Sequence, residues 1–222
     1  MSEQDPVAIW REALKDSSHP RHRAAWLLFP DRVNIKAAAK QLADQKEAVV
    51  GYLYEILDTE ALYNIDSLGR GNAPINAVEL LGEWQVTEAV PRLLRILEEN
   101  WNTMVHNRAI IALRKMGPQI LETLLAYMDT ADPDVAEALI GLLSDAGKGD
   151  PHVFEMVKAR LDKAEEAGNE WDIHYMAENL LAIDAEKAIA LLEERIKARR
   201  YNKRLREILQ GYITSTREKG MP

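Results

Sequence analysis

Apolar residues recur along this chain with the spacing of one face of an α-helix. Ten segments have apolar residues at all of the positions i, i+3, i+4 and i+7, which is the pattern of an amphipathic helix. They start at Ile35, Val50, Ala77, Val90, Ala109, Leu121, Val135, Ile173, Ala185 and Leu205, and an eleventh, from Val153, fits in part. Turn-forming residues such as Gly117-Pro118 and Asp132-Pro133 fall between the segments. The pattern predicts helices of about 10–18 residues joined by short turns, with essentially no strands.

The segments alternate between two kinds, called inner and outer here. Inner segments start at positions 50, 90, 121, 153 and 185, at spacings of 40, 31, 32 and 32 residues. A period near 32 with two helices per period is typical of an α-solenoid, because one helix pair cannot bury its apolar stripe alone. We therefore expect an all-α fold, a right-handed α-α superhelix of about five helix pairs plus terminal helices, forming a single domain over residues 1–222.

Two sequences recur in the most regular part of the chain. Residues 89–97 read AVPRLLRIL and residues 107–117 read NRAIIALRKMG, while residues 77–84, AVELLGEW, repeat the second pattern. They resemble the second and first helices of HEAT-like repeats of the armadillo and phycobilin-lyase type, with Arg108 and Ala109 in the usual Arg-x-x-Ala-like region. The resemblance covers residues 72–196 and implies a HEAT-like solenoid, but it does not specify a biochemical family.

The two ends of the chain are less regular. Residues 1–71 follow the repeat poorly, and residues 58–76, which contain Gly69, Gly71 and Pro74, are the longest expected loop. Residues 203–222 are expected to form a capping helix and tail, because a solenoid end needs a polar outer face. The apolar stripe of this helix is predicted at Leu205, Ile208, Leu209 and Tyr212.

The exposed side of the inner helices follows from the same helical geometry. Positions +2, +5 and +9 from each inner start lie roughly opposite the core stripe at about 100° per residue. In a solenoid these positions line the concave groove, which is the usual interaction surface. We call this set the ladder: Tyr52, Glu55, Thr59, Arg92, Arg95, Glu99, Thr123, Ala126, Thr130, Glu155, Lys158, Asp162, Lys187, Ala190 and Glu194.

The mixed charge of the ladder favours a folded or peptide-like protein partner over a uniformly charged polymer. Arg92 and Arg95 are predicted as the main contacts, since arginine is a frequent energetic anchor, and Tyr52 as the aromatic contact. Trp101, in the polar turn between an inner and an outer helix, is a candidate aromatic anchor. The predicted binding residues are Tyr52, Glu55, Arg92, Arg95, Glu99, Thr123, Glu155, Lys158, Lys187 and Glu194.

Charge is distributed unevenly along the chain. The net charge is −8, but residues 195–219 hold nine Lys or Arg and two Glu, a local charge of +7, which leaves −15 for the remainder. An acidic body disfavours nucleic-acid binding over most of the surface. We interpret the basic segment as cations near helix C-termini and a solubilising cap. Binding to an acidic protein, a nucleic acid or a membrane surface remains the alternative.

No strong catalytic or cofactor motif is evident. The chain has no cysteine, no H-E-x-x-H and no His-Glu dipeptide of the kind found in HEAT-like deoxyhypusine hydroxylases, and GLLSDAGK at 141–148 has the wrong spacing for a phosphate loop. Glu170, His174 and Glu178 share one helix face, a pattern more typical of a solvated face than of a metal site. We expect no enzyme activity, no cofactor and no metal.

The sequence also bears on location and on the class of function. The N-terminus lacks the apolar run of a secretory signal, and the longest apolar stretch, 24–29, is too short to span a bilayer, so a cytoplasmic protein is expected. The leading hypothesis is a non-enzymatic scaffold that binds a protein partner of unknown identity in the concave groove. The alternatives are a nucleic-acid-associated HEAT-like protein using its basic C-terminal end, and a phycobilin-lyase-like subunit.

Overall fold

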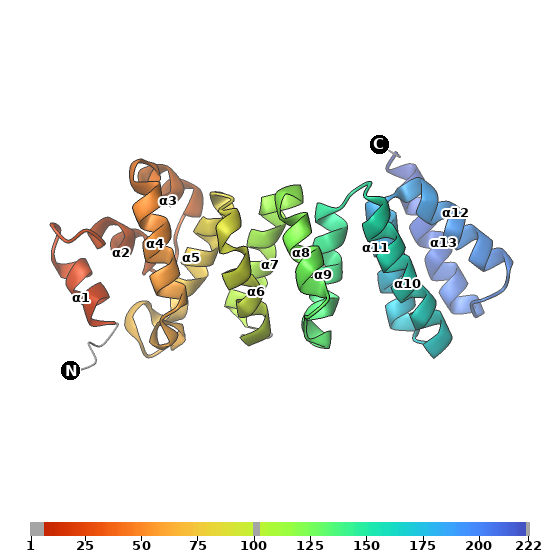
Figure 1. Cartoon of the computed structure of the whole chain (residues 1–222), viewed down its shortest axis with the longest axis horizontal. Helices are drawn as coiled ribbons and strands as arrows, with labels where there is room; N and C mark the ends of the chain where they lie inside the picture. The colour runs from red at the N-terminus through yellow and green to blue at the C-terminus, as the bar shows by residue number, and fades with distance from the viewer. Residues whose placement is uncertain (1–6, 100–102, 221–222) are drawn as a thin grey trace. The chain divides into compact units, whose positions relative to one another are not determined.

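The computed structural model describes residues 7–99 and 103–220, and over these residues the regular elements are all helices (Figure 1). The all-α expectation is therefore confirmed for the described part of the chain. The chain divides into two compact units, Met1–Ile120 (unit 1) and Leu121–Pro222 (unit 2). The predicted single repeat domain over residues 1–222 remains a prediction. No helix in the described ranges is long and apolar enough to cross a membrane.

Unit 1 is built from seven α-helices and five short 3-10 helices. The α-helices are α1 (Ala8–Lys15), α2 (His22–Leu28), α3 (Ile35–Gln41), α4 (Lys46–Leu57), α5 (Asn72–Glu83), α6 (Val90–Glu99) and α7 (Met104–Met116). The 3-10 helices are η1 (Ala43–Gln45), η2 (Glu60–Tyr63), η3 (Leu68–Gly71), η4 (Thr87–Ala89) and η5 (Gly117–Ile120). Helix α5 packs against both α3 and α7, while α4 and α6 cover α5 and α7 from the other layer.

Unit 2 repeats this arrangement with longer helices. Its helices are α8 (Leu121–Met128), α9 (Pro133–Ala146), α10 (Pro151–Ala167), α11 (Glu170–Ile183), α12 (Ala185–Lys197) and α13 (Lys203–Glu218). Helix α11 packs against α9 and α13 in one layer and against α10 and α12 in the other. The core lies between the layers, where Leu139, Val157, Leu161, Leu180 and Leu192 are fully buried.

The hydrophobic period predicted the helices well. Each of the eleven predicted segments starts within an observed helix, and those from Ile35 and Ala77 end one residue beyond it. Ile35, Val90, Leu121 and Ala185 are the first residues of α3, α6, α8 and α12. Asx and Thr residues fix several of the helix starts by accepting backbone N–H groups. The caps with such a bond are Asn34, Thr103, Asp150, Asn169, Asp184 and Asn202.

Helices α5 and α7 approach each other closely at a glycine. A Cβ atom added to Gly82 would lie 2.6 Å from the Cα of Ala112 and 2.7 Å from its Cβ. Two small residues at the crossing, Gly82 and Ala112, therefore allow the backbones to meet. The contact fixes the spacing of the repeat within unit 1.

Residues 58–76 include the longest connection between α-helices in the described ranges, residues 58–71, in agreement with the expected loop. They contain η2, η3 and the first residues of α5, and three successive residues, Gly69, Arg70 and Gly71, have positive φ angles. The buried side chain of Asn76 donates hydrogen bonds to the carbonyl oxygens of Leu28 (2.7 Å) and Pro30 (3.2 Å). The expected loop is therefore present, although part of it is 3-10 helix. The contact of Asn76 holds the start of α5 against the end of α2, which a hydrophobic period does not detect.

The buried apolar residues of α13 also differ in part from the predicted ones. Leu205, Leu209 and Ile213 are buried, whereas Ile208 and Tyr212 are only half-buried. The buried positions follow a spacing of four residues, so the contact line of α13 with α11 and α12 runs through Ile213 in place of Tyr212.

Candidate functional site

The ladder positions of unit 1 lie on the side of α4 and α6 that faces away from the core. Glu55, Arg95 and Glu99 are exposed, and the other three, Tyr52, Thr59 and Arg92, are half-buried. The opposite side of the same two helices buries Leu53, Ile56, Leu93 and Leu97. Helical geometry therefore placed these six residues on the surface as predicted, while their role in binding stays a prediction.

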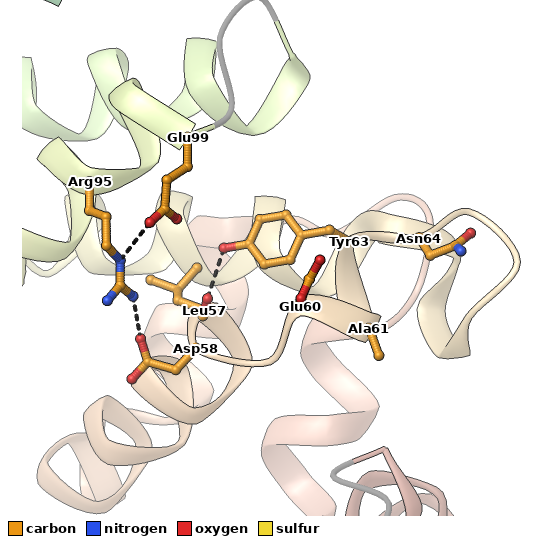
Figure 2. A pocket seen from close by; sticks show the side chains of 8 residues that line it. All are labelled: Leu57, Asp58, Glu60, Ala61, Tyr63, Asn64, Arg95 and Glu99. Atoms are coloured by element: carbon orange, nitrogen blue, oxygen red, sulfur yellow. Dashed lines mark hydrogen bonds and ion pairs between the residues drawn. The ribbon is translucent and has the colours of Figure 1, made fainter. Parts of the chain in front are cut away.

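An aspartate that the sequence did not single out connects the two helices. The Arg95 Nη2 donates to Asp58 Oδ1 at 2.6 Å, and the Arg92 Nε lies 3.4 Å from Asp58 Oδ2. The Arg95 Nε also lies 3.8 Å from Glu99 Oε1, so Arg95 stands between two carboxylates (Figure 2). The hydrogen bond that Arg95 donates to Asp58 raises the pKa of Arg95 further above its ordinary value. Asp58 thus holds both predicted anchors in fixed positions.

An open groove of about 1080 Å³ lies beside this network, between the C-terminal ends of α4 and α6 and the η2 segment. Figure 2 shows Arg95 and Glu99 extending from α6 toward the side of Asp58 and Tyr63. The lining residues are Leu57, Asp58, Glu60, Ala61, Tyr63, Asn64, Arg95 and Glu99. Three of them carry a carboxylate and one carries a guanidinium, so the groove has an excess of negative charge.

Tyr63 forms a fixed wall of the groove. Its hydroxyl donates a hydrogen bond of 3.0 Å to the carbonyl oxygen of Leu57, across the turn between α4 and η2. Burial raises the pKa of Tyr63 to about 12; the nearby Arg95 opposes this shift and Asp58 adds to it. The phenol is therefore neutral at ordinary pH and acts as a hydrogen-bond donor to the backbone.

Aromatic and cationic side chains also meet elsewhere on this face. The guanidinium of Arg92 lies 4.2 Å from the centre of the Tyr54 ring, within the range of a cation–π contact. Arg21 is 4.8 Å from the centre of the Tyr52 ring and forms two hydrogen bonds with Glu55, of 2.7 and 2.8 Å. The predicted contacts Tyr52 and Glu55 thus already have an intramolecular partner, and a ligand there would compete with Arg21.

The ladder positions of unit 2 are also on the surface, but no comparable network joins them. Thr123, Glu155, Lys187 and Glu194 are exposed, and Lys158 is half-buried, with its Nζ 3.1 Å from Glu155 Oε2. The remaining position with a charge, Asp162, accepts a hydrogen bond from the buried Arg195 and belongs to the packing between α10 and α12.

The tryptophans divide into buried and exposed ones. Trp10 is buried, whereas Trp84 is only half-buried, with Lys46 Nζ 5.8 Å from its ring centre. Trp26 and Trp171 are 60% and 62% exposed, and no sequence pattern had identified them as surface residues. The predicted anchor Trp101 lies outside the described residues.

Two of the three residues that were considered as a metal site, Glu170 and His174, contact other side chains. His174 packs edge-on against Trp171, with ring centres 4.7 Å apart, and its Nδ1 lies 3.4 Å from the hydroxyl of Tyr212. Glu170 accepts a hydrogen bond from Asn202. Within residues 7–99 and 103–220, no group of three or more His, Asp or Glu side chains is placed to hold a metal ion.

The basic segment 195–219 has two kinds of cation. Arg195 is buried between Asp162 and Glu165, and Arg200 and Arg217 pair with Glu165 (3.2 Å) and Glu193 (2.9 Å). These cations join α12 and α13 to the rest of unit 2. Lys203 and Arg204, by contrast, lie in the first turn of α13. The interpretation that the cations gather near helix C-termini is therefore only partly correct.

Comparison with known proteins adds no family to this description. No family model matches the chain, and no curated protein matches it. The function therefore has to be argued from the site itself, since a fold alone does not imply a function.

Proposed function

We propose that the protein is a non-enzymatic scaffold that binds a segment of a partner protein in the groove between α4 and α6. The observation that supports this most strongly is the Asp58–Arg95–Glu99 network beside an open groove of about 1080 Å³. As part of the same proposal, the helix pairs are HEAT-like repeats of the right-handed α-α superhelix type, and the ladder is their interaction face.

The form of the groove favours a polypeptide over a small molecule. Small-molecule sites are concave, mostly apolar and roughly 300–1,000 Å³ in volume. This groove is open and lined by charged and amide side chains, with Leu57 and Ala61 as its aliphatic members. An extended chain could use the alternation of donors and acceptors that Arg95, Glu99 and Asn64 provide.

The charge of the groove indicates which kind of partner segment would be complementary to it. Arg95 is neutralised by Asp58 and Glu99, whereas Glu60 lies on the opposite wall, and the lining carries more carboxylates than guanidinium groups. A partner segment that places a lysine or arginine against Glu60 and a backbone carbonyl oxygen against the N–H donors of Arg95 would be complementary to it. Complementary charge of this kind contributes more to specificity and association rate than to affinity.

A pair of double variants tests this assignment. Arg92→Ala with Arg95→Ala should weaken binding of the native partner, isolated by affinity capture from the source cells, by more than about 1 kcal/mol. The matched control is Arg108→Ala with Lys115→Ala, which breaks the exposed ion pairs of 2.9 Å to Glu79 and Glu83 between α7 and α5. Both double variants remove two cations and two inter-helix ion pairs from unit 1.

The control defines the outcome that contradicts the proposal. Loss of binding in the α7 variant with unchanged binding in the α6 variant would place the site on the outer layer. Exposed ion pairs contribute about 0–1 kcal/mol each, so both variants should keep the helical circular dichroism spectrum of the unchanged protein.

A further inference from the structure

The connection between α12 and α13 is the most cationic part of the described chain. Residues 195–206 contain seven cations and no carboxylate. We call the cations beyond the buried Arg195 the basic turn: Lys197, Arg199, Arg200, Lys203, Arg204 and Arg206. Of these, all but Arg206 are exposed. The basic turn belongs to unit 2 and does not rest on the groove of unit 1.

Neighbouring carboxylates neutralise only part of this charge. Asp162 and Glu165 pair with Arg195, Glu165 also pairs with Arg200, and Glu207 lies 3.9 Å from Lys203. Glu170 contacts Asn202, the cap of α13. Seven cations against these four carboxylates leave a local charge of +3, carried by side chains that face solvent.

The stability of α13 does not account for the cations at its start. Lys203 and Arg204 are in the first turn, and that turn has no acidic residue. The N-terminal end of a helix carries a partial positive charge, so cations there are unfavourable for the helix, while anions are favourable. Asn202 caps the Leu205 N–H, and the positive end of the helix and both side chains therefore attract the same kind of ligand, a negatively charged one.

Arg199 has a backbone conformation that favours glycine. Its φ angle is 55°, and it follows Ala198, the C-cap of α12, whereas Gly168 has the equivalent conformation at the end of α10. Glycine is the usual residue at such a position because a Cβ atom makes the left-handed conformation unfavourable. The backbone conformation therefore gives no reason for an arginine at position 199.

We propose that the basic turn binds a short acidic segment of a partner protein. Arginine guanidinium groups pair with carboxylates through two parallel hydrogen bonds, and Arg199 and Arg204 are both exposed for such contacts. The nearby α10–α11 connection carries Glu165, Glu166 and Glu170, two of which contact the turn or its flanks. A nucleic acid extending past the turn would meet these carboxylates, so a short acidic peptide fits the surface better.

The first test uses a fluorescently labelled oligoglutamate peptide as the probe, with binding followed by anisotropy on the full chain. The triple variant Lys197→Gln, Lys203→Gln and Arg204→Gln should bind this peptide roughly tenfold more weakly. The control variant Lys15→Gln, Lys36→Gln and Lys40→Gln removes the same number of positive charges from exposed positions of unit 1. It should bind the peptide as the unchanged protein does.

A single variant separates binding from folding. Arg199→Gly should leave the melting temperature unchanged or raise it, because glycine suits the φ of 55°, and should still weaken peptide binding. Gln85→Gly makes the same backbone change at the end of α5, where φ is 50°, without altering the charge, and should not affect binding.

Three results would overturn the proposal. One is equal binding of the peptide by the patch and control triple variants. Another is tighter binding of a single-stranded oligonucleotide or of phosphatidylserine vesicles than of oligoglutamate through the same residues, because the surface would then recognise phosphate. The last is self-association of the unchanged protein that the patch variant abolishes, which would make a second copy of this chain the acidic partner.

Discussion

At the scale of single residues, the tight packing between α5 and α7 predicts that a larger side chain at the crossing destabilises the fold. Gly82→Ala would place a Cβ atom 2.6 Å from the Cα of Ala112 and should lower the free energy of unfolding by about 1–3 kcal/mol. Gly51→Ala, on α4, meets no atom within 4 Å and should raise it by up to about 1 kcal/mol. Urea denaturation of both variants measures the difference. Equal effects of the two alanines would contradict the close helix crossing.

Tyr63 makes a prediction about alkaline pH. Its pKa of about 12 in the folded protein lies above the ordinary value of 10 because the phenol is buried. The folded state therefore keeps this proton longer than the unfolded state, so the contribution of Tyr63 to stability is complete below pH 10 and is lost as pH rises from 10 through 12. Tyr63→Phe should reduce the slope of stability against pH in that window, as followed by circular dichroism during urea titration. An unchanged slope would show that the phenol is not buried.

What the sequence could predict at this scale depended on the helical period. The exposed positions of Arg95 and Glu99 follow from their spacing to the buried residues of α6. Asp58 lies at the very end of α4, outside the positions that were considered, and Tyr63 lies in a 3-10 helix without an apolar period. Six of the eight residues that line the groove were therefore missed, because most of them are brought in by a turn geometry that periodicity does not encode.

At the scale of elements, α13 is held by an apolar stripe whose position the structure corrects. Leu205, Leu209 and Ile213 are buried, and each contributes about 1.5–3 kcal/mol as an upper estimate. Deleting residues 203–222 should expose the facing sides of α11 and α12, which causes aggregation or a clearly lower melting temperature. Deleting residues 219–222 alone is the control and should have little effect. A protein without α13 that is as soluble and stable as the full chain would refute this role.

The elements that the sequence missed share a physical cause. Helices predicted from apolar stripes are present because stripe burial is a local requirement of every repeat. By contrast, the placement of α5 against residues 28–30 involves Asn76, which donates to carbonyl groups almost fifty residues earlier in the chain. A polar residue within an otherwise apolar helix face is ambiguous in sequence, since burial with a distant partner and exposure to solvent give the same pattern.

At the scale of the whole molecule, the chain combines two surfaces with opposite charge. Unit 1 carries a groove with an excess of carboxylates, and unit 2 carries the basic turn, while the net charge of the chain is −8. A scaffold with two such surfaces could hold a basic segment of one partner and an acidic segment of another. The two proposals use residues from different units, so each can fail without the other.

The central claim is that a partner protein lies in the groove between α4 and α6, and site-specific photo-crosslinking tests it most directly. A photoreactive amino acid placed at Glu60, on the groove wall, is compared in the source cells with one at Ile111, which is 40% exposed on α7 of the same unit. The account predicts a discrete crosslinked partner from position 60 and none from position 111. Crosslinks from position 111 alone, or from neither position, would contradict it.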